Sequence, residues 1–127
     1  MFPRWLFTLP ILICVTTLCG CKGGQQVEPY AIANRGSVHD GRRAIRDYKC
    51  GECHTIPGIA GAHGVFGPPL TMMARRSYIA GNFPNTPDNL EHWVMAPTAM
   101  KPKTAMPDLG LTQQQARDIT AYLETLR

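Results

Sequence analysis

The sequence predicts an all-α fold whose long loops wrap around one large ligand. Apolar residues recur at helical spacing in three stretches, 40–49, 86–96 and 112–126. No stretch alternates apolar and polar residues as a half-buried strand would. The segments 55–70 and 98–110 are rich in glycine and proline and read as loops. Loops of this length are uncommon in a compact domain, so we expect a large bound group to fill the space that they enclose.

Capping signals delimit the later helices. Thr86 caps the second helix and is followed by a proline and an acidic residue in the first turn, while Pro97 ends it because the residue before a proline disfavours helix. Thr112 and Gln115 have the spacing of a capping box and open the last helix. A further short helix is expected over 70–79.

The first helix leads directly into Cys50-Gly51-Glu52-Cys53-His54, which has the form C-x-x-C-H. Two thiols at this spacing can each bond one vinyl group of a porphyrin, and the adjacent histidine can ligate its iron. The alternatives are half of a zinc site or a thiol redox pair. A zinc site needs more ligands at suitable spacing, and a thioredoxin-like pair needs a βαβ pattern. The motif therefore predicts one covalently bound haem c, held by Cys50 and Cys53 and ligated by His54.

Iron bound by one histidine has an open sixth position. A methionine there would raise the reduction potential and close the site to other ligands. Met106 is favoured over Met100 because it stands in the stiff, proline-punctuated loop 101–107. A pair of histidines, with His92 or His63 as sixth ligand, would give a haem of lower potential. The remaining candidates are Met72, Met73, Met95 and His39.

The first twenty residues read as a signal peptide. Arg4 precedes an apolar run that is too short for an ordinary membrane-spanning helix. The run ends in Leu-Cys-Gly-Cys at 18–21, which resembles the lipobox of bacterial lipoproteins, whose last cysteine is lipidated and becomes the N-terminus. The alternatives are an ordinary cleaved signal peptide and an uncleaved anchor. If haem occupies Cys50 and Cys53, a lipid on Cys21 accounts for the one thiol left in the mature chain.

Three segments follow from this interpretation. They are a lipoprotein signal peptide over 1–20, a flexible tether over 21–37 and one domain over 38–127. The protein is then expected in a bacterial periplasm, anchored through its lipid to the inner or the outer membrane. The 13 lysines and arginines against 9 acidic residues give a charge excess too small to indicate nucleic-acid binding.

From Gly41 to Leu126 the sequence resembles the class I c-type cytochromes. Members of that family pair a glycine-containing first helix with a tyrosine-bearing last helix, and Gly41 and Tyr122 match these features. The resemblance implies a small cytochrome c fold whose N- and C-terminal helices cross at the glycine, where a Cβ would obstruct close approach. Gly67-Pro68-x-Leu70 also matches, which implies that the carbonyl of Pro68 accepts a hydrogen bond from the haem histidine.

The same resemblance assigns further contacts to the haem. Pro97, Pro102, Thr104 and Met106 match the methionine loop of the family in order and spacing, which implies Met106 as the sixth ligand. Thr104 and Arg76 are then candidates to bind a haem propionate, with Arg75 as a substitute for Arg76. Trp93 is expected to pack against the ring.

A narrower similarity concerns the cytochrome c domain that is fused to subunit II of caa3-type oxidases. It is carried by the segments 78–81, 84–90 and 106–109. This chain lacks the copper-binding domain and the transmembrane hairpin of those subunits and is expected to be a free-standing, lipid-tethered version.

The predicted function is therefore electron transfer rather than catalysis. We expect a monohaem cytochrome that carries single electrons between membrane respiratory complexes, toward a terminal oxidase, with redox proteins as partners and no small-molecule substrate. Lys101 and Lys103 beside the methionine could dock an acidic partner. The alternatives are a haem enzyme or gas sensor with a labile sixth ligand, and a structural subunit whose haem does not turn over.

Overall fold

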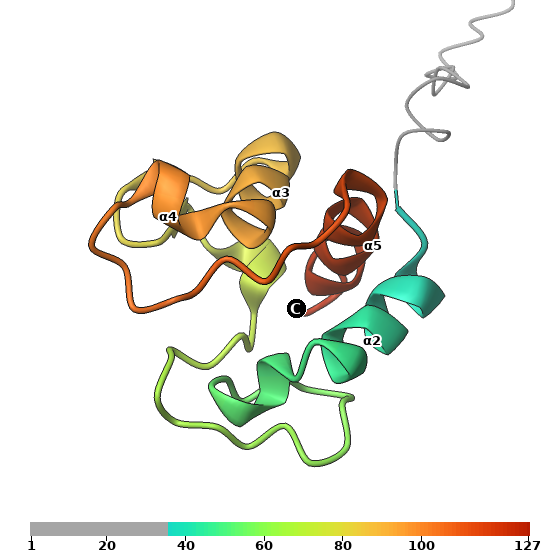
Figure 1. Cartoon of the computed structure of the whole chain (residues 1–127). Helices are drawn as coiled ribbons and strands as arrows, with labels where there is room; N and C mark the ends of the chain where they lie inside the picture. The colour runs from blue at the N-terminus through green and yellow to red at the C-terminus, as the bar shows by residue number, and fades with distance from the viewer. Residues whose placement is uncertain (1–35) are drawn as a thin grey trace, which may run out of the picture.

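The computed structural model describes residues 36–127 (Figure 1). The predicted signal peptide, the lipidated Cys21 and all but two residues of the predicted tether lie outside the described residues. In chain order the elements are α2 (Val38–Asp47), the 3₁₀ turns η1 (Cys50–Glu52) and η2 (Met73–Arg75), β1 (Tyr78–Ile79), β2 (Phe83–Pro84), α3 (Pro87–Met95), α4 (Pro97–Met100) and α5 (Gln113–Leu123). Within this range, no helix combines the length and the apolar character needed to cross a membrane.

The first and last described helices, α2 and α5, lie side by side (Figure 1) and make the most extensive contact between any two elements of the described chain. They touch backbone to backbone, because a Cβ built on Gly41 would lie only 1.9 Å from the carbonyl oxygen of Asp118. The backbone N–H of Ser37 donates to Oδ1 of Asp118 at 2.7 Å, which ties the start of α2 to α5. The close approach expected at Gly41 is therefore present.

The helix boundaries follow the capping chemistry. Ser37 is the N-cap of α2, with its hydroxyl accepting from the backbone N–H of Asp40, so this helix begins two residues before the predicted start. Thr86 caps α3 and Thr112 opens α5 with a complete capping box, as predicted. Helix α3 ends at Met95, before Pro97.

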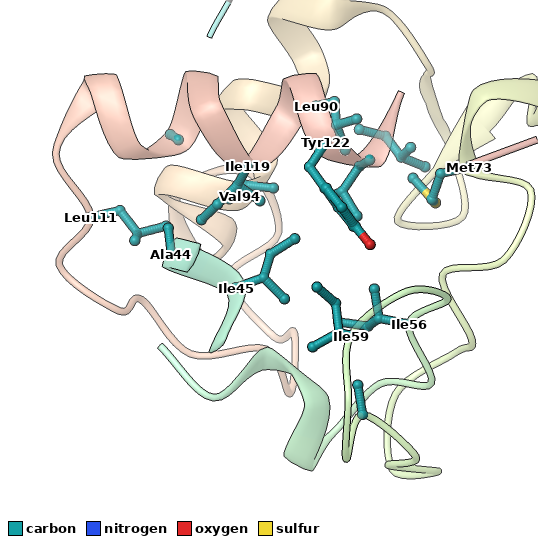
Figure 2. Close-up of a cluster of buried hydrophobic side chains, with 14 residues drawn as sticks. Ala44, Ile45, Ile56, Ile59, Met73, Leu90, Val94, Leu111, Ile119 and Tyr122 are labelled. Carbon is teal, nitrogen blue, oxygen red and sulfur yellow. The ribbon is translucent and has the colours of Figure 1, made fainter. Parts of the chain in front are cut away.

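The hydrophobic core lies between α2, α3, α5 and the loop that follows the C-x-x-C-H motif (Figure 2). Its buried members are Ala44, Ile45, Ile56, Ile59, Ala62, Met73, Ile79, Leu90, Val94, Leu111, Ala116, Ile119, Tyr122 and Leu123. The hydroxyl of Tyr122 donates to the carbonyl of Pro57 at 2.6 Å and so fastens that loop to α5.

Three local predictions need correction. The strands β1 and β2 form a small antiparallel sheet where no strand was expected, because strands of two residues are too short to show an alternating pattern. The segment after Pro97 forms the single helical turn α4 rather than an extended loop, since a proline is favourable at the first position of a helix. The helix expected over 70–79 is reduced to the turn η2.

Candidate functional site

A cavity of about 500 Å³ lies between the core and the loops. This volume is within the range typical of cofactor sites. Its walls come from the C-x-x-C-H segment, the following loop, the β1–β2 hairpin and the loop after α4, and the buried side chains of α2, α3 and α5 close it from behind. The lining includes Cys50, Cys53, His54, Pro68, Arg76, Trp93, Thr104 and Met106. All eight residues predicted to contact the haem therefore line one cavity.

The two cysteines reach this cavity through a sharp change of direction after α2. Lys49 adopts a left-handed conformation with φ of 56°, and the turn η1 begins directly after it. Neither cysteine is in a disulfide. Burial raises the pKa of the Cys50 thiol, and the neighbouring Cys53 adds to this effect.

The surroundings of the cysteines also disfavour a zinc site. Within residues 36–127 no group of three or more histidine, cysteine, aspartate or glutamate side chains is placed to hold a metal ion. A structural zinc site requires four such ligands. The zinc interpretation of the motif therefore has no support in the described part of the chain.

The imidazole of His54 is oriented by the loop that follows it. Its Nδ1 lies 2.7 Å from the carbonyl oxygen of Pro68. A carbonyl only accepts, so Nδ1 carries the proton and Nε2 keeps its lone pair for a metal. Gly67 packs against the ring, where a Cβ would lie 2.4 Å from Cε1 of His54. The hydrogen bond that the resemblance implies is thus present, and the absence of a side chain at Gly67 makes room for the ring.

The loop against His54 is itself held in place by backbone hydrogen bonds. The N–H of Gly67 donates to the carbonyl of Cys53 at 2.7 Å, and that of Leu70 donates to the carbonyl of Thr55 at 2.8 Å. These bonds fix the carbonyl of Pro68 between them. The orientation of the imidazole is therefore set by the backbone.

The structure separates the candidates for a sixth ligand. Of the eight methionines and histidines considered, only Met73 and Met106 line the cavity. Met73 is 4% exposed and belongs to the hydrophobic core. Both histidine alternatives, His92 and His63, are exposed and lie outside the cavity.

Short-range hydrogen bonds shape the loop that carries Met106. The backbone N–H of Met106 donates to the hydroxyl oxygen of Thr104 at 3.2 Å, and the N–H of Thr104 donates to the carbonyl of Lys101 at 2.9 Å. At the base of the loop, both the hydroxyl and the backbone N–H of Thr98 donate to the carboxylate of Asp108. The loop is thus closed at its base and turned at its tip, as a side chain held at a fixed position requires.

Arg76 and Thr104, which are expected to bind a haem propionate, make hydrogen bonds to other groups of the chain. One terminal nitrogen of Arg76, Nη2, donates to the carbonyls of Pro69 and Thr71. The other terminal nitrogen of Arg76 makes no hydrogen bond to a described residue and could bind a carboxylate. The hydroxyl of Thr104 accepts from Met106 and keeps its own hydrogen to donate. Arg75 is exposed and does not line the cavity, so it is a poorer candidate than Arg76.

The ring of Trp93 lines the cavity and lies against Phe83, with ring centroids 6.4 Å apart and planes tilted by 34°. Phe83 belongs to the hairpin that the sequence did not reveal, so this contact was not predicted. Phe66, Tyr78 and Lys101 also line the cavity without having been proposed there. The position of Phe66 could have been predicted from the sequence, because it is a large apolar residue within a glycine-rich loop.

The composition of the cavity fits a haem. It offers mostly apolar side chains, a pair of free thiols, an imidazole with an available Nε2 and a thioether from a separate loop. Half-buried arginine and threonine side chains are available for carboxylates at its edge. No residue of the described lining contradicts the ligand set that the sequence predicted.

Comparison with known proteins agrees with this geometry. The family model described as cytochrome c matches residues 38–127. A curated relative, cytochrome c oxidase subunit 2 of Alkalihalophilus pseudofirmus, is 30% identical over 91 residues. The aligned region covers 71% of this chain but only 26% of the relative, so the chain spans about a quarter of that protein's length.

Proposed function

Since the chain belongs to the cytochrome c family and is a haem electron-transfer protein, we propose that it carries single electrons through one covalently bound haem between membrane respiratory complexes. The observation that carries the proposal is the cavity that brings the C-x-x-C-H motif and Met106 together. The sequence has one such motif, which supports a single haem. When bound, the haem supplies one-electron exchange between ferric and ferrous iron.

The protein's own residues then have distinct roles in this proposal. Cys50 and Cys53 would hold the porphyrin through thioether bonds, and His54 would offer Nε2 to the iron while the carbonyl of Pro68 fixes the orientation of the imidazole. Met106, which lines the same cavity, would supply a thioether as a second iron ligand, which would raise the reduction potential and exclude other ligands. The apolar lining keeps water away from the site.

We further propose that the electrons pass toward a terminal oxidase. The similarity to a protein named cytochrome c oxidase subunit 2 supports an oxidase partner. Lys103 is exposed within the loop that carries Met106 and is suited to docking an acidic surface. A diacylglyceryl group on Cys21 would keep the domain at the periplasmic face of a membrane, with residues 21–37 as a tether. Replacement of Cys21 by serine should therefore release the protein from the membrane fraction.

The ligand assignment is tested by optical spectra of the protein matured in a periplasm. We expect a low-spin spectrum with a sulfur-to-iron charge-transfer band that is lost in Met106→Ala, and no binding of carbon monoxide by the reduced wild type. Met100→Ala is the matched control, because Met100 is also a methionine of this region but does not line the cavity.

Other outcomes would redirect the interpretation. A charge-transfer band that survives in Met106→Ala would exclude Met106 as the sixth ligand and leave Met73 as the methionine of the cavity. Rapid carbon monoxide binding by the wild type would show a labile sixth position and favour the enzyme or sensor function. Absence of covalent haem would refute the proposal altogether.

A further inference from the structure

Two walls of the cavity are separate in the chain and meet at its edge. One is the β1–β2 hairpin with its turn at Ala80 and Gly81, and the other is the loop 101–107 that carries Met106. The ammonium of Lys101 donates to the carbonyl oxygen of Ala80 at 3.1 Å. Among the hydrogen bonds of the described residues, no other joins residues 76–86 to residues 97–110.

The hairpin turn presents this carbonyl in an unusual way. Ala80 and Gly81 both have positive φ, 50° and 95°, and the N–H of Asn82 donates to the carbonyl of Ile79 at 3.2 Å. Two successive positive φ values in such a turn define type I′. An alanine in the left-handed region is unfavourable relative to glycine. The backbone around the acceptor is therefore held in a conformation that its sequence does not favour by itself.

Lys101 is also well placed at the base of its own loop. Its backbone N–H donates to the carbonyl of Pro97 at 2.9 Å, at the end of α4, and its carbonyl accepts from Thr104. The residue thus anchors the loop on the helix side and on the hairpin side. Movement of the loop away from the hairpin must break the bond to Ala80.

We propose that Lys101 is a positioning residue that latches the Met106 loop to the hairpin and so limits how often Met106 leaves the iron. This proposal rests on the proposed function, because it assumes that Met106 ligates the haem. In this proposal Lys101 acts through the loop and not as an iron ligand. The chemistry that the latch would control is the access of small external ligands, such as imidazole, to the sixth position.

The test compares Lys101→Met with Lys103→Met in the haem-loaded, full-length protein. Methionine keeps an unbranched apolar stem and removes the donor. Lys103 lies two residues further on, carries the same charge and makes no hydrogen bond or ion pair with another described residue, so its replacement controls for charge. Lys101→Arg restores a long donor and should restore the wild-type behaviour.

The first readout is the limiting rate of imidazole binding to the ferric protein at saturating imidazole, which reports the opening of the loop. One charge-assisted hydrogen bond at an exposed site corresponds to roughly a three- to fivefold faster opening in Lys101→Met. Lys103→Met should bind at the wild-type rate. Equal rates in all variants, or equal acceleration in both methionine variants, would overturn the latch.

The second readout is hydrogen exchange, which does not depend on iron ligation. The amides of Thr104 and Met106 both donate within the loop and should exchange roughly three- to fivefold faster in Lys101→Met. The amide of Ala116 in α5, which donates to the carbonyl of the N-cap residue Thr112, should exchange at the wild-type rate. Faster exchange at Ala116 as well would indicate global destabilisation and overturn a local latch.

The two proposals fail in different ways. If Met106 is not a ligand, the charge-transfer band is either absent from the wild type or unchanged in Met106→Ala, whichever residue occupies 101. The exchange rates of Thr104 and Met106 still decide whether Lys101 holds the loop. If the band is present but neither readout changes in Lys101→Met, the ligand assignment stands and the latch is refuted.

Discussion

Gly41 provides the sharpest test of how the two terminal helices are packed. A Cβ at this position would lie 1.9 Å from the carbonyl oxygen of Asp118, 2.5 Å from its carbonyl carbon and 3.0 Å from the backbone nitrogen of Ile119. These are backbone atoms of α5 and cannot rotate away. For a normal contact of about 3.4 Å, α2 and α5 must separate locally by about 1.5 Å.

The expected cost of Gly41→Ala follows from two opposing effects. Alanine is favoured over glycine in a helix interior by about 1 kcal/mol. Overpacking costs about 1–3 kcal/mol, and a gap of 1 Å or more forfeits much of the dispersion energy of the side chains beside it, here Ile45 and Ile119. The packing effect is larger, so the free energy of unfolding should fall by about 2 kcal/mol.

Guanidinium denaturation of the haem-loaded protein, followed by far-ultraviolet circular dichroism, measures this change. Gly61→Ala is the control, because nothing lies within 4 Å of its Cβ position and only its φ of 78° opposes a side chain. That substitution should cost about 1 kcal/mol. If Gly41→Ala proved as stable as the wild type or more so, the helices would not approach as closely as described here.

Two other substitutions test the site and the loop beside it. Gly67→Ala should lower the free energy of unfolding by about 2 kcal/mol, because its Cβ would meet the ring of His54. It should also raise the reduction potential, because it weakens the hydrogen bond from His54 to the carbonyl of Pro68. A redox titration that shows no change would contradict this contact. Tyr122→Phe removes the hydrogen bond to Pro57 and should cost about 1 kcal/mol in urea denaturation, whereas wild-type stability would mean that water replaces the hydroxyl.

Much of the site could be predicted from the sequence because its chemistry is local. Cys50, Cys53 and His54 fall within five consecutive residues, so their spacing alone indicated the ligand. The caps at Thr86 and Thr112 are equally local and were confirmed in the structure. The placement of Gly41 against α5 is a long-range contact, and the sequence indicated it only through resemblance to a family.

The features that the sequence did not reveal depend on long-range geometry. The contact between Lys101 and Ala80 joins residues 21 positions apart. It also requires Ala80 to adopt the left-handed backbone conformation, which an alanine in the sequence does not predict. The hairpin around that alanine has strands of two residues each, which are defined by hydrogen bonds rather than by an apolar pattern. Among the candidate sixth ligands, exposure at His92 and burial at Met73 follow from packing that spacing cannot show.

The core and the cavity share their side chains, which explains why so small a domain tolerates such long loops. Ile45, Met73, Ile119 and Leu123 belong to the buried cluster and also line the cavity. A group bound there therefore extends the core that the helices begin, and the loops pack on that group instead of on each other. Contacts between the loops and a covalently held haem exist only in the folded state and add to its stability, so the order of the loops and the packing of the haem in the cavity are thermodynamically coupled. The long loops, which would be unfavourable in a domain of this size, are thus the part of the structure that the cofactor completes.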